Sequence, residues 1–288
     1  MVNLGHQGDQ HIVDVHFDGP HAALPVEVLQ RRDVIARFDR AHFARPQRHT
    51  FRQLMLVHGS GGYHSIDFER VALLPRRLIA LRPGQVHRWD ASTPTEATIV
   101  LGQAWVGGDE RWFPGQPSYT DLDGARYAAA SGLIDAMANA QSEFEPRGAA
   151  ERILIATFAA LEALFALSAT PERDRVANND PYTAYRQSIE SAMAVGEPPH
   201  NVADYAATLP FSARTVARAC ARATGQTPKQ LLDQRIVLEA QRLLANTDMS
   251  AASIGARLGF SEPTNFAKFY ARGTGQTPAA FRRTASAS

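Results

Sequence analysis

The chain has 288 residues, about the length of two domains that each bury a core of their own. Apolar residues make up 44% and charged residues 20%, which excludes a disordered, highly charged chain. We see no apolar run as long as a membrane helix, and residues 1–10 are polar, so we expect no membrane partner and a cytoplasmic location. The single cysteine, Cys220, excludes an intrachain disulfide.

The net charge of +1 hides an asymmetry between the two parts of the chain. Residues 182–288 contain 12 Lys and Arg against 7 Asp and Glu, whereas residues 1–181 contain 18 against 22. The C-terminal part is therefore the basic one. Phosphate binding requires such an asymmetry, although an excess of this size is also common in domains that bind no nucleic acid.

Residues 12–106 have the pattern of short strands separated by turns. Turn residues occur at Gly59-Ser60-Gly61-Gly62 and at Arg82-Pro83-Gly84. The expected strands are 12–17, 26–29, 53–58, 63–68, 78–81 and 98–101. Such regular spacing is typical of a β-sandwich or a small barrel.

From residue 125 the apolar pattern becomes helical. We expect helices at 125–142 and 149–167, separated by Pro146-Arg147-Gly148. The second helix is unusually apolar, which leaves two interpretations open: packing on its own β-domain, or pairing of subunits. The polar residues 168–181 form the best candidate linker.

A repeat of about fifty residues dominates the C-terminal part. Arg222-Ala-Thr-Gly-Gln-Thr-Pro228 recurs as Arg272-Gly-Thr-Gly-Gln-Thr-Pro278, and Ala206-Ala-Thr-Leu-Pro-Phe-Ser212 matches Gly255-Ala-Arg-Leu-Gly-Phe-Ser261. In each copy a short helix, a tight turn, a serine N-cap, a second helix and a terminal glycine follow one another. This order predicts two helix-turn-helix units. Residues 227–245 between them are expected to form one helix of about 28 Å.

The second helix of each unit has one apolar face and one polar or basic face. In the first copy Val216, Ala219, Cys220 and Ala223 share the apolar face, which makes a catalytic or redox role of the cysteine improbable. The opposite faces suit a DNA major groove, with Arg214, Arg218, Thr264 and Lys268 as candidates for base contact and Ser212, Ser261, Arg222 and Arg272 for phosphate contact. The alternative is that each basic stripe is only a solvated face.

The strings Gly-Phe-Ser at 259–261 and Thr-Gly-Gln-Thr-Pro-x-x-Phe at 274–281 resemble the AraC/XylS family of bacterial regulators. The resemblance covers about residues 182–283. It implies a first reading helix at 212–224 and a second at 262–272. The implied base-facing residues are Arg214, Ala217 and Arg218 in the first, and Pro263, Thr264, Ala267 and Lys268 in the second. Ala217 and Ala267 are shorter than the polar residues of some members, so contact with thymine methyl groups is the option left to them.

The N-terminal half is similar to the cupin-type sensor domain of that family. Arg82-Pro-Gly-Gln-Val-His87 resembles the second cupin motif, and Gly61-Gly-Tyr-His64 resembles the start of the first. Ser65 and Ile66 follow His64, so the second histidine of a cupin metal site is missing and we expect no metal or other cofactor, although His49, His58, His64 and His87 could form an irregular site. Candidates for an effector pocket are Arg52, His58, His64, His87 and Trp89; an ordinary structural role is equally open for each.

The resemblance thus implies an α+β multidomain chain. A cupin-like β-barrel with two flanking helices would occupy residues 1–170, a linker residues 171–181, and an all-α DNA-binding domain residues 182–288. The implied function is sequence-specific DNA-binding transcription regulation, with activation and repression both left open. The implied partners are promoter DNA, a small organic effector, RNA polymerase and a second copy bound through residues 125–167. The alternative is a metal-dependent cupin enzyme with an accessory helical domain, in which turnover depends on His64 and His87.

Overall fold

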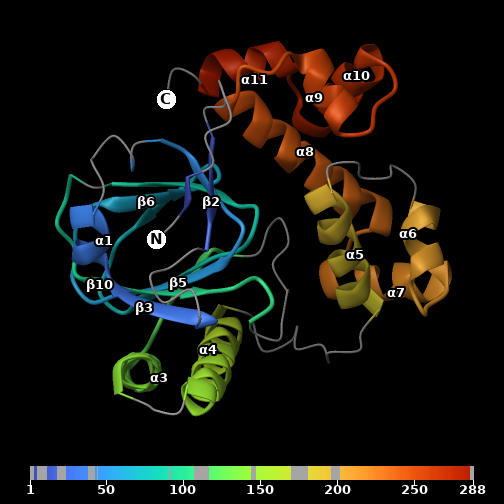
Figure 1. Cartoon of the computed structure of the whole chain (residues 1–288). Coiled ribbons are helices and arrows are strands. Elements are labelled where there is room, and N and C mark those ends of the chain that lie inside the picture. Colours follow the sequence, from blue (N-terminus) through green and yellow to red (C-terminus); the bar gives the residue numbers. More distant parts are fainter. Residues whose placement is uncertain are drawn as a thin grey trace. The chain divides into compact units, whose positions relative to one another are not determined.

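The computed structural model describes residues 3–4, 12–17, 24–37, 43, 45–90, 92–106, 117–143, 147–169, 181–195 and 202–285. The chain separates into two compact units (Figure 1). The first unit comprises Met1–Asp109 and Pro117–Arg173, and the second comprises Glu110–Gln116 and Asp174–Ser288. The expected linker, residues 171–181, lies outside the described residues except for Pro181.

The first unit contains two sheets. One consists, in spatial order, of β1 (Asn3–Leu4), β2 (Val13–His16), β4 (Gln47–His49), β9 (Val86–Trp89), β6 (Tyr63–Ile66) and β7 (Glu69–Ala72). The other consists of β11 (Tyr119–Asp121), β8 (Arg77–Leu81), β5 (Arg52–Val57), β10 (Ala97–Gly102) and β3 (Val26–Gln30). Neighbouring strands are antiparallel except β2 and β4, and α1 (Arg31–Arg37) follows β3 directly.

The closed barrel expected from the cupin resemblance is wrong, and the sandwich alternative is correct. Among the described strands, no hydrogen-bonded pair joins one sheet to the other. Three of the four outer strands, β1, β7 and β11, have only two to four residues, which leaves short ladders for pairing one sheet with the other. All six predicted strands are present; β1, β4, β7, β9 and β11 were missed because each has only two to four residues and carries charged, polar or histidine side chains.

The five-stranded sheet is buried on both faces. In β5, Met55 and Val57 point toward the other sheet, whereas Leu54 and Leu56 point toward α3 (Gly124–Glu143) and α4 (Arg147–Ala169). Figure 1 shows the two helices beneath this sheet. From α4, Leu154, Phe158, Leu161 and Phe165 are buried. The Phe158 ring lies so close to Gly102 that a Cβ atom there would be 2.7 Å from its Cζ atom.

The sequence-based statement that no segment is long and apolar enough for a membrane helix needs correction. Residues 148–169, within α4, reach that length and apolar content. In the structure four large apolar side chains of α4 are buried, and its Glu162 forms an ion pair of 2.8 Å with Arg52 of β5. These are features of a helix that packs on a sheet, which confirms packing on its own β-domain; pairing of subunits through the exposed side of α4 stays a prediction.

Three buried histidines form a hydrogen-bonded chain inside the sandwich. His64 Nε2 lies 2.8 Å from His87 Nδ1, and His87 Nε2 lies 2.9 Å from His49 Nε2. Burial, followed by the neighbouring His87 and Arg31, holds the pKa of His64 well below its usual value. His87 uses its two ring nitrogens toward different neighbours, so the three imidazoles do not converge on one point. Among the described residues there is accordingly no cluster that could hold a metal ion.

The second unit is all-helical. Its elements are α5 (Pro181–Val195), α6 (Val202–Thr208), α7 (Ala213–Thr224), α8 (Pro228–Asn246), α9 (Ala251–Arg257), α10 (Pro263–Thr274) and α11 (Pro278–Ala285). Figure 1 shows α8 running from α5–α7 at one end to α9–α11 at the other. The single joining helix predicted at 227–245 is therefore confirmed. Thr227 and Gln230 form a capping box at its start, and Leu231, Leu232, Ile236, Leu243 and Leu244 are buried.

Buried ion pairs on α8 were not predicted from the sequence. Arg235 Nε lies 2.8 Å from Glu190 Oε1 of α5, and its NH1 lies 3.3 Å from Glu239 Oε2. Arg242, which is fully buried, reaches the same Glu239 oxygen at 3.2 Å. These contacts connect the first helix of the unit to the joining helix, and removing one partner would leave an uncompensated buried charge.

Acidification is expected to destabilise the first unit through His64. Because the pKa of His64 is lowered in the folded chain, the contribution of the neutral His64 ring to the free energy of unfolding is fully present above about pH 6.5. Below that value the unfolded chain takes up the proton first, and each further pH unit removes up to about 1.4 kcal/mol of stability. Urea unfolding at pH 7.5, 6.5 and 5.5, followed by tryptophan fluorescence, measures the effect, since Trp89 lies beside His64. Equal unfolding free energies at pH 7.5 and 5.5 would contradict this expectation. His16→Gln, a change at an exposed histidine, is the control and is measured at the same pH values.

Gly255→Ala is expected to loosen the second helix-turn-helix unit. A Cβ atom at Gly255 would lie 2.9 Å from Cβ of Phe266, where α9 packs on α10. Crowding of this kind costs about 1–3 kcal/mol. Thermal unfolding of the variant measures the loss. Ala256→Ser is the matched control, because Ala256 is the next residue of α9 and is exposed; a similar melting temperature for the two variants would be evidence against the crowding.

Candidate nucleic-acid interface

The first reading helix, α7, begins and ends at well-defined caps. Ser212 is the N-cap, and its Oγ atom accepts a hydrogen bond of 3.1 Å from the backbone N–H of Thr215. Gly225 ends the helix with a φ of 70°, and its N–H donates to the carbonyl of Ala221. Both caps were predicted, and each satisfies backbone groups that a helix end leaves unpaired.

The two faces of α7 separate as the projection predicts. Val216, Ala219 and Cys220 are buried, whereas Arg214, Ala217, Arg218 and Arg222 are exposed. Within the described part of the chain, the three arginines form no ion pair. Their guanidinium groups are therefore available to an anionic or hydrogen-bonding partner, unlike those of Arg235 and Arg242 on the neighbouring helix.

The second reading helix, α10, starts differently, and one expectation fails there. Ser261 is not the N-cap: Glu262 holds that position, and its side chain makes no capping hydrogen bond. The cause is one extra residue in the second copy, since Ser261 matches Ser212 at an offset of 49, whereas Pro263 at N1 matches Ala213 at an offset of 50. Proline at N1 fixes where the helix begins.

The outward face of α10 is less basic than that of α7. Phe266, Phe269 and Tyr270 are buried. The exposed residues include Ser261, Pro263, Thr264, Ala267, Lys268 and Arg272. Arg272 lies with its guanidinium carbon 5.9 Å from the centre of the Phe269 ring. All eleven residues assigned to DNA contact from the sequence are thus exposed, and each group lies on or beside one reading helix.

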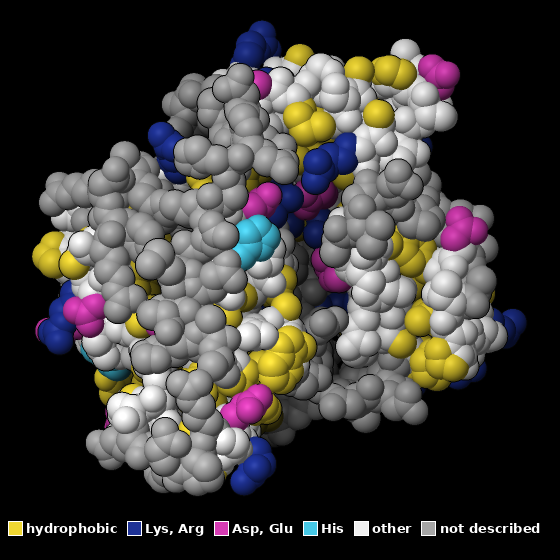
Figure 2. Space-filling model, viewed as in Figure 1, with side chains coloured by type: hydrophobic (Ala, Val, Ile, Leu, Met, Phe, Trp, Pro, Cys, Tyr) yellow, Lys and Arg dark blue, Asp and Glu magenta, His cyan; other side chains and the backbone are white. Residues whose placement is uncertain are grey.

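The charged side chains on the face drawn in Figure 2 do not form one broad positive patch. Lys and Arg are interspersed there with Asp and Glu. On this face, the positive charge is therefore local to single Lys and Arg side chains.

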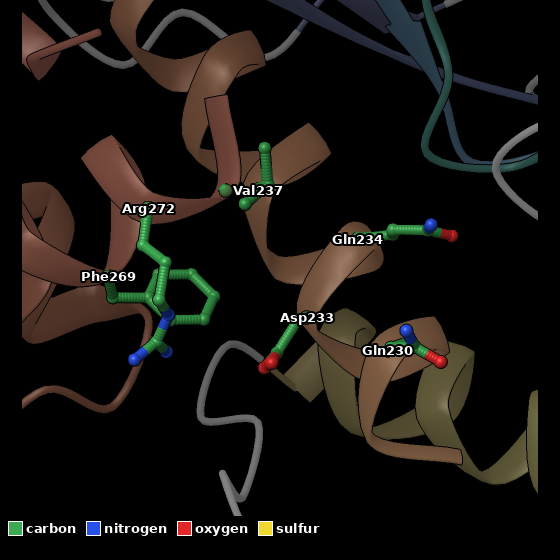
Figure 3. A pocket seen from close by; sticks show the side chains of 7 residues that line it. Gln230, Asp233, Gln234, Val237, Phe269 and Arg272 are labelled. Carbon is green, nitrogen blue, oxygen red and sulfur yellow. The ribbon is translucent and has the colours of Figure 1, made fainter. Parts of the chain in front are cut away.

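A hollow of about 240 Å³ lies between α8 and α10 (Figure 3). It is lined by Gln230, Asp233, Gln234, Val237, Phe269, Arg272 and Gly273. Figure 3 shows Arg272 in front of the Phe269 ring and Asp233 directed toward the same space. Sites that enclose a small molecule usually have about 300–1,000 Å³, so this hollow is small for an effector.

The five candidates for an effector pocket fall into two groups on opposite sides of the five-stranded sheet. Arg52 and His58 lie on the side of the helices. Arg52 contacts Glu162 of α4, and His58 Nδ1 lies 2.8 Å from the Tyr127 hydroxyl of α3. Burial lowers the pKa of His58 despite the nearby Glu96 and Asp135, and burial raises the pKa of Glu162 against the effect of Arg52.

The other three candidates, His64, His87 and Trp89, lie together inside the sandwich. The Trp89 ring is 5.3 Å from that of His64, and the guanidinium of Arg31 lies 5.6 Å from Trp89. Sequence reasoning did not place Arg31 here. No sequence pattern signals it, because it follows β3 at the start of α1 and reaches Trp89 only in the folded unit.

Comparison with known proteins bears on both units. Residues 205–284 match the family model described as a helix-turn-helix domain. The HTH-type transcriptional activator RhaS of Enterobacter sp. (strain 638) is 24% identical over 251 residues, 83% of this chain and 88% of the relative. The RhaS protein of Citrobacter koseri is 23% identical over 235 residues, 78% and 82% of the two chains.

Two solved structures are also similar. The DNA-binding domain of AdpA, solved in complex with a target DNA, is 32% identical and covers 38% of this chain and 96% of its own, with a TM-score of 0.33. ToxT from Vibrio cholerae is 8% identical and covers 90% and 97%, with a TM-score of 0.38.

The family match and the two curated relatives agree with the duplicated unit in the sequence. They also decide against the alternative of a cupin-type enzyme. The chain is therefore an AraC-type, RhaS-like helix-turn-helix transcription regulator, with the helix-turn-helix domain at its C-terminal end and a β-domain before it.

Proposed function

We propose that this regulator binds promoter DNA by placing α7 and α10 in successive major grooves of one duplex. The observation that carries the proposal is the exposed arginine face of α7, on a helix whose other face is buried. Base contacts are assigned to Arg214, Ala217, Arg218, Pro263, Thr264, Ala267 and Lys268. Phosphate contacts are assigned to Ser212, Arg222, Ser261 and Arg272.

The joining helix supports this arrangement by its length and stiffness. The 19 residues of α8 span about 28 Å, and successive major-groove faces lie about 34 Å apart. The capping box at Thr227 and the ion pairs of Arg235 and Arg242 keep the helix continuous and attached to α5. A rigid connection of this length suits two reading helices one turn of DNA apart.

A small organic effector is assigned to the N-terminal region, with a division into residues 1–170, a linker at 171–181 and a DNA-binding domain at 182–288. His64, His87 and Trp89 bring three aromatic rings together inside the sandwich. Arg52 and His58 connect the neighbouring sheet to α4 and α3. A ligand that binds one packing of these layers better than another would shift the equilibrium between them.

Dimerisation is assigned to α3 and α4, and activation to contact with RNA polymerase. Both curated relatives are named transcriptional activators, which supports activation here. On α4, Ala156, Ala160, Ala163 and Leu167 are exposed along one stripe. Small side chains there allow a second helix to approach closely. The cytoplasm, where promoter DNA and polymerase are found, is the location that this function requires.

Arg218→Ala is expected to lower the affinity for a selected promoter duplex about tenfold and to relax the base preference at one position. The reason is the loss of a bidentate contact with guanine, worth about 1–3 kcal/mol. Fluorescence anisotropy at 50–200 mM salt measures both the affinity and its salt dependence. Arg88→Ala, an exposed arginine of β9, is the control. Equal affinities for Arg218→Ala and Arg88→Ala, or affinity independent of salt, would count against the proposed interface.

Ala160→Arg is expected to turn a dimer into a monomer without unfolding the chain. Ala160 is exposed, so the new side chain costs little in the folded subunit, but two of them would meet at a paired α4 surface. Sedimentation velocity measures the oligomeric state, and circular dichroism checks the fold. Arg126→Ala is the comparison variant, since Arg126 is exposed on the neighbouring helix α3 and lies outside the α4 stripe. A dimer that persists in Ala160→Arg would exclude pairing through this stripe.

A further inference from the structure

We propose that the two reading helices are unequal: α7 fixes a half-site with two G·C pairs and supplies most of the sequence discrimination, whereas α10 binds its half-site with weaker base preference. The inference rests on the proposed function, and it adds which half of the operator is specific and which bases it contains.

Matched positions of the repeat carry different chemistry. At an offset of 50 residues, Thr264 takes the place of Arg214 and Lys268 takes the place of Arg218. The guanidinium of arginine is a rigid fork of donors that matches O6 and N7 of guanine, whereas the ammonium of lysine is a point charge on a flexible stem. A threonine hydroxyl serves several bases equally. The first helix therefore has two selective groups where the second has none of that kind.

The spacing of the arginines predicts the spacing of the guanines. Arg214 and Arg218 are four residues apart on the exposed face of one helix, which separates them by about 6 Å along its axis. A base step of DNA is about 3.4 Å, so the two arginines reach bases about two steps apart. Ala217 lies on the same exposed face and lets the helix approach the base edges closely.

The start of α10 is less suited to a phosphate than the start of α7. Glu262, the N-cap, is exposed and makes no capping hydrogen bond, so it places a negative charge at the end of the helix that would face DNA. Pro263 at N1 has no N–H to donate. In α7 the corresponding residues are Ser212 and Ala213, which bring no negative charge.

The charge of the two reading segments differs in the same direction. Residues 212–225 contain three exposed arginines and no acidic residue, whereas residues 261–275 contain Lys268 and Arg272 against Glu262. Each phosphate contact adds about 0.9 to the slope of log affinity against log salt. Affinity as well as discrimination is thus concentrated on α7.

Selection of bound duplexes from a random pool by the full-length chain is the first test. The expected operator has two parts about 10 base pairs apart. One part contains two strongly selected guanines about two steps apart, and the other has weaker selection at every position. Equal selection in the two parts, or a specific part without guanines, would overturn the inference.

A pair of charge-conserving substitutions then assigns each part to its helix. Arg218→Lys is expected to reduce discrimination against a replaced guanine in the specific part about tenfold, while affinity for random duplex stays within about twofold. Lys268→Arg is expected to create a guanine preference in the other part. Arg88→Lys, outside the reading helices, is the control. If Arg218→Lys leaves the guanine preference intact, or Lys268→Arg creates none, the assignment is wrong.

The same measurements separate this inference from the proposed function. Salt-sensitive duplex binding with equal use of both helices would uphold the proposed function and overturn the inequality. Absence of salt-sensitive binding to any duplex would overturn both.

Discussion

The attachment of α8 to both helix-turn-helix units is the constraint on which the reading surface depends. Two helices can enter successive grooves of one duplex only if their separation is held, and a single continuous helix connects them here. Its apolar residues are buried at both ends, and Arg235 binds Glu190 across to α5. Because breaking a buried ion pair leaves a charge without compensation, the ion pair resists separation of these helices. The geometry of DNA contact is thus set in the interior of the unit.

Arginine has two opposite roles within about thirty residues of this unit. Arg235 and Arg242 are buried and paired with carboxylates, whereas Arg214 and Arg218 are exposed on the preceding helix and form no ion pair with any described residue. The difference follows from the helix face on which each residue lies and from whether a glutamate on a neighbouring element reaches it. An exposed guanidinium keeps its donors for a base edge, while a buried one uses them to hold helices together.

In the N-terminal unit, burial of one sheet on both faces couples the sandwich to the helices. The strands β5 and β10 send alternate residues to the histidine-containing interior and to α3 and α4. Phe158 packs against Gly102, and Arg52 binds Glu162, so α4 has both an apolar and an ionic attachment to the sheet. A change in the interior of the sandwich can reach the helices through this sheet, because dense packing transmits small displacements.

The sequence alone determined the features that depend on near neighbours. The caps at Ser212 and Gly225, the joining helix, the buried face of α7 and the repeat itself follow from helical periodicity and turn residues within one segment. Glu262 as the N-cap of α10 depended on one inserted residue that the repeat obscured. The tertiary structure decided the open sandwich, the contacts of His49, His64 and His87 across three strands, and the partners of Arg52 and Arg235. These contacts join residues 23 to 110 positions apart, and no local pattern specifies which distant strand or helix will pack against a given side chain.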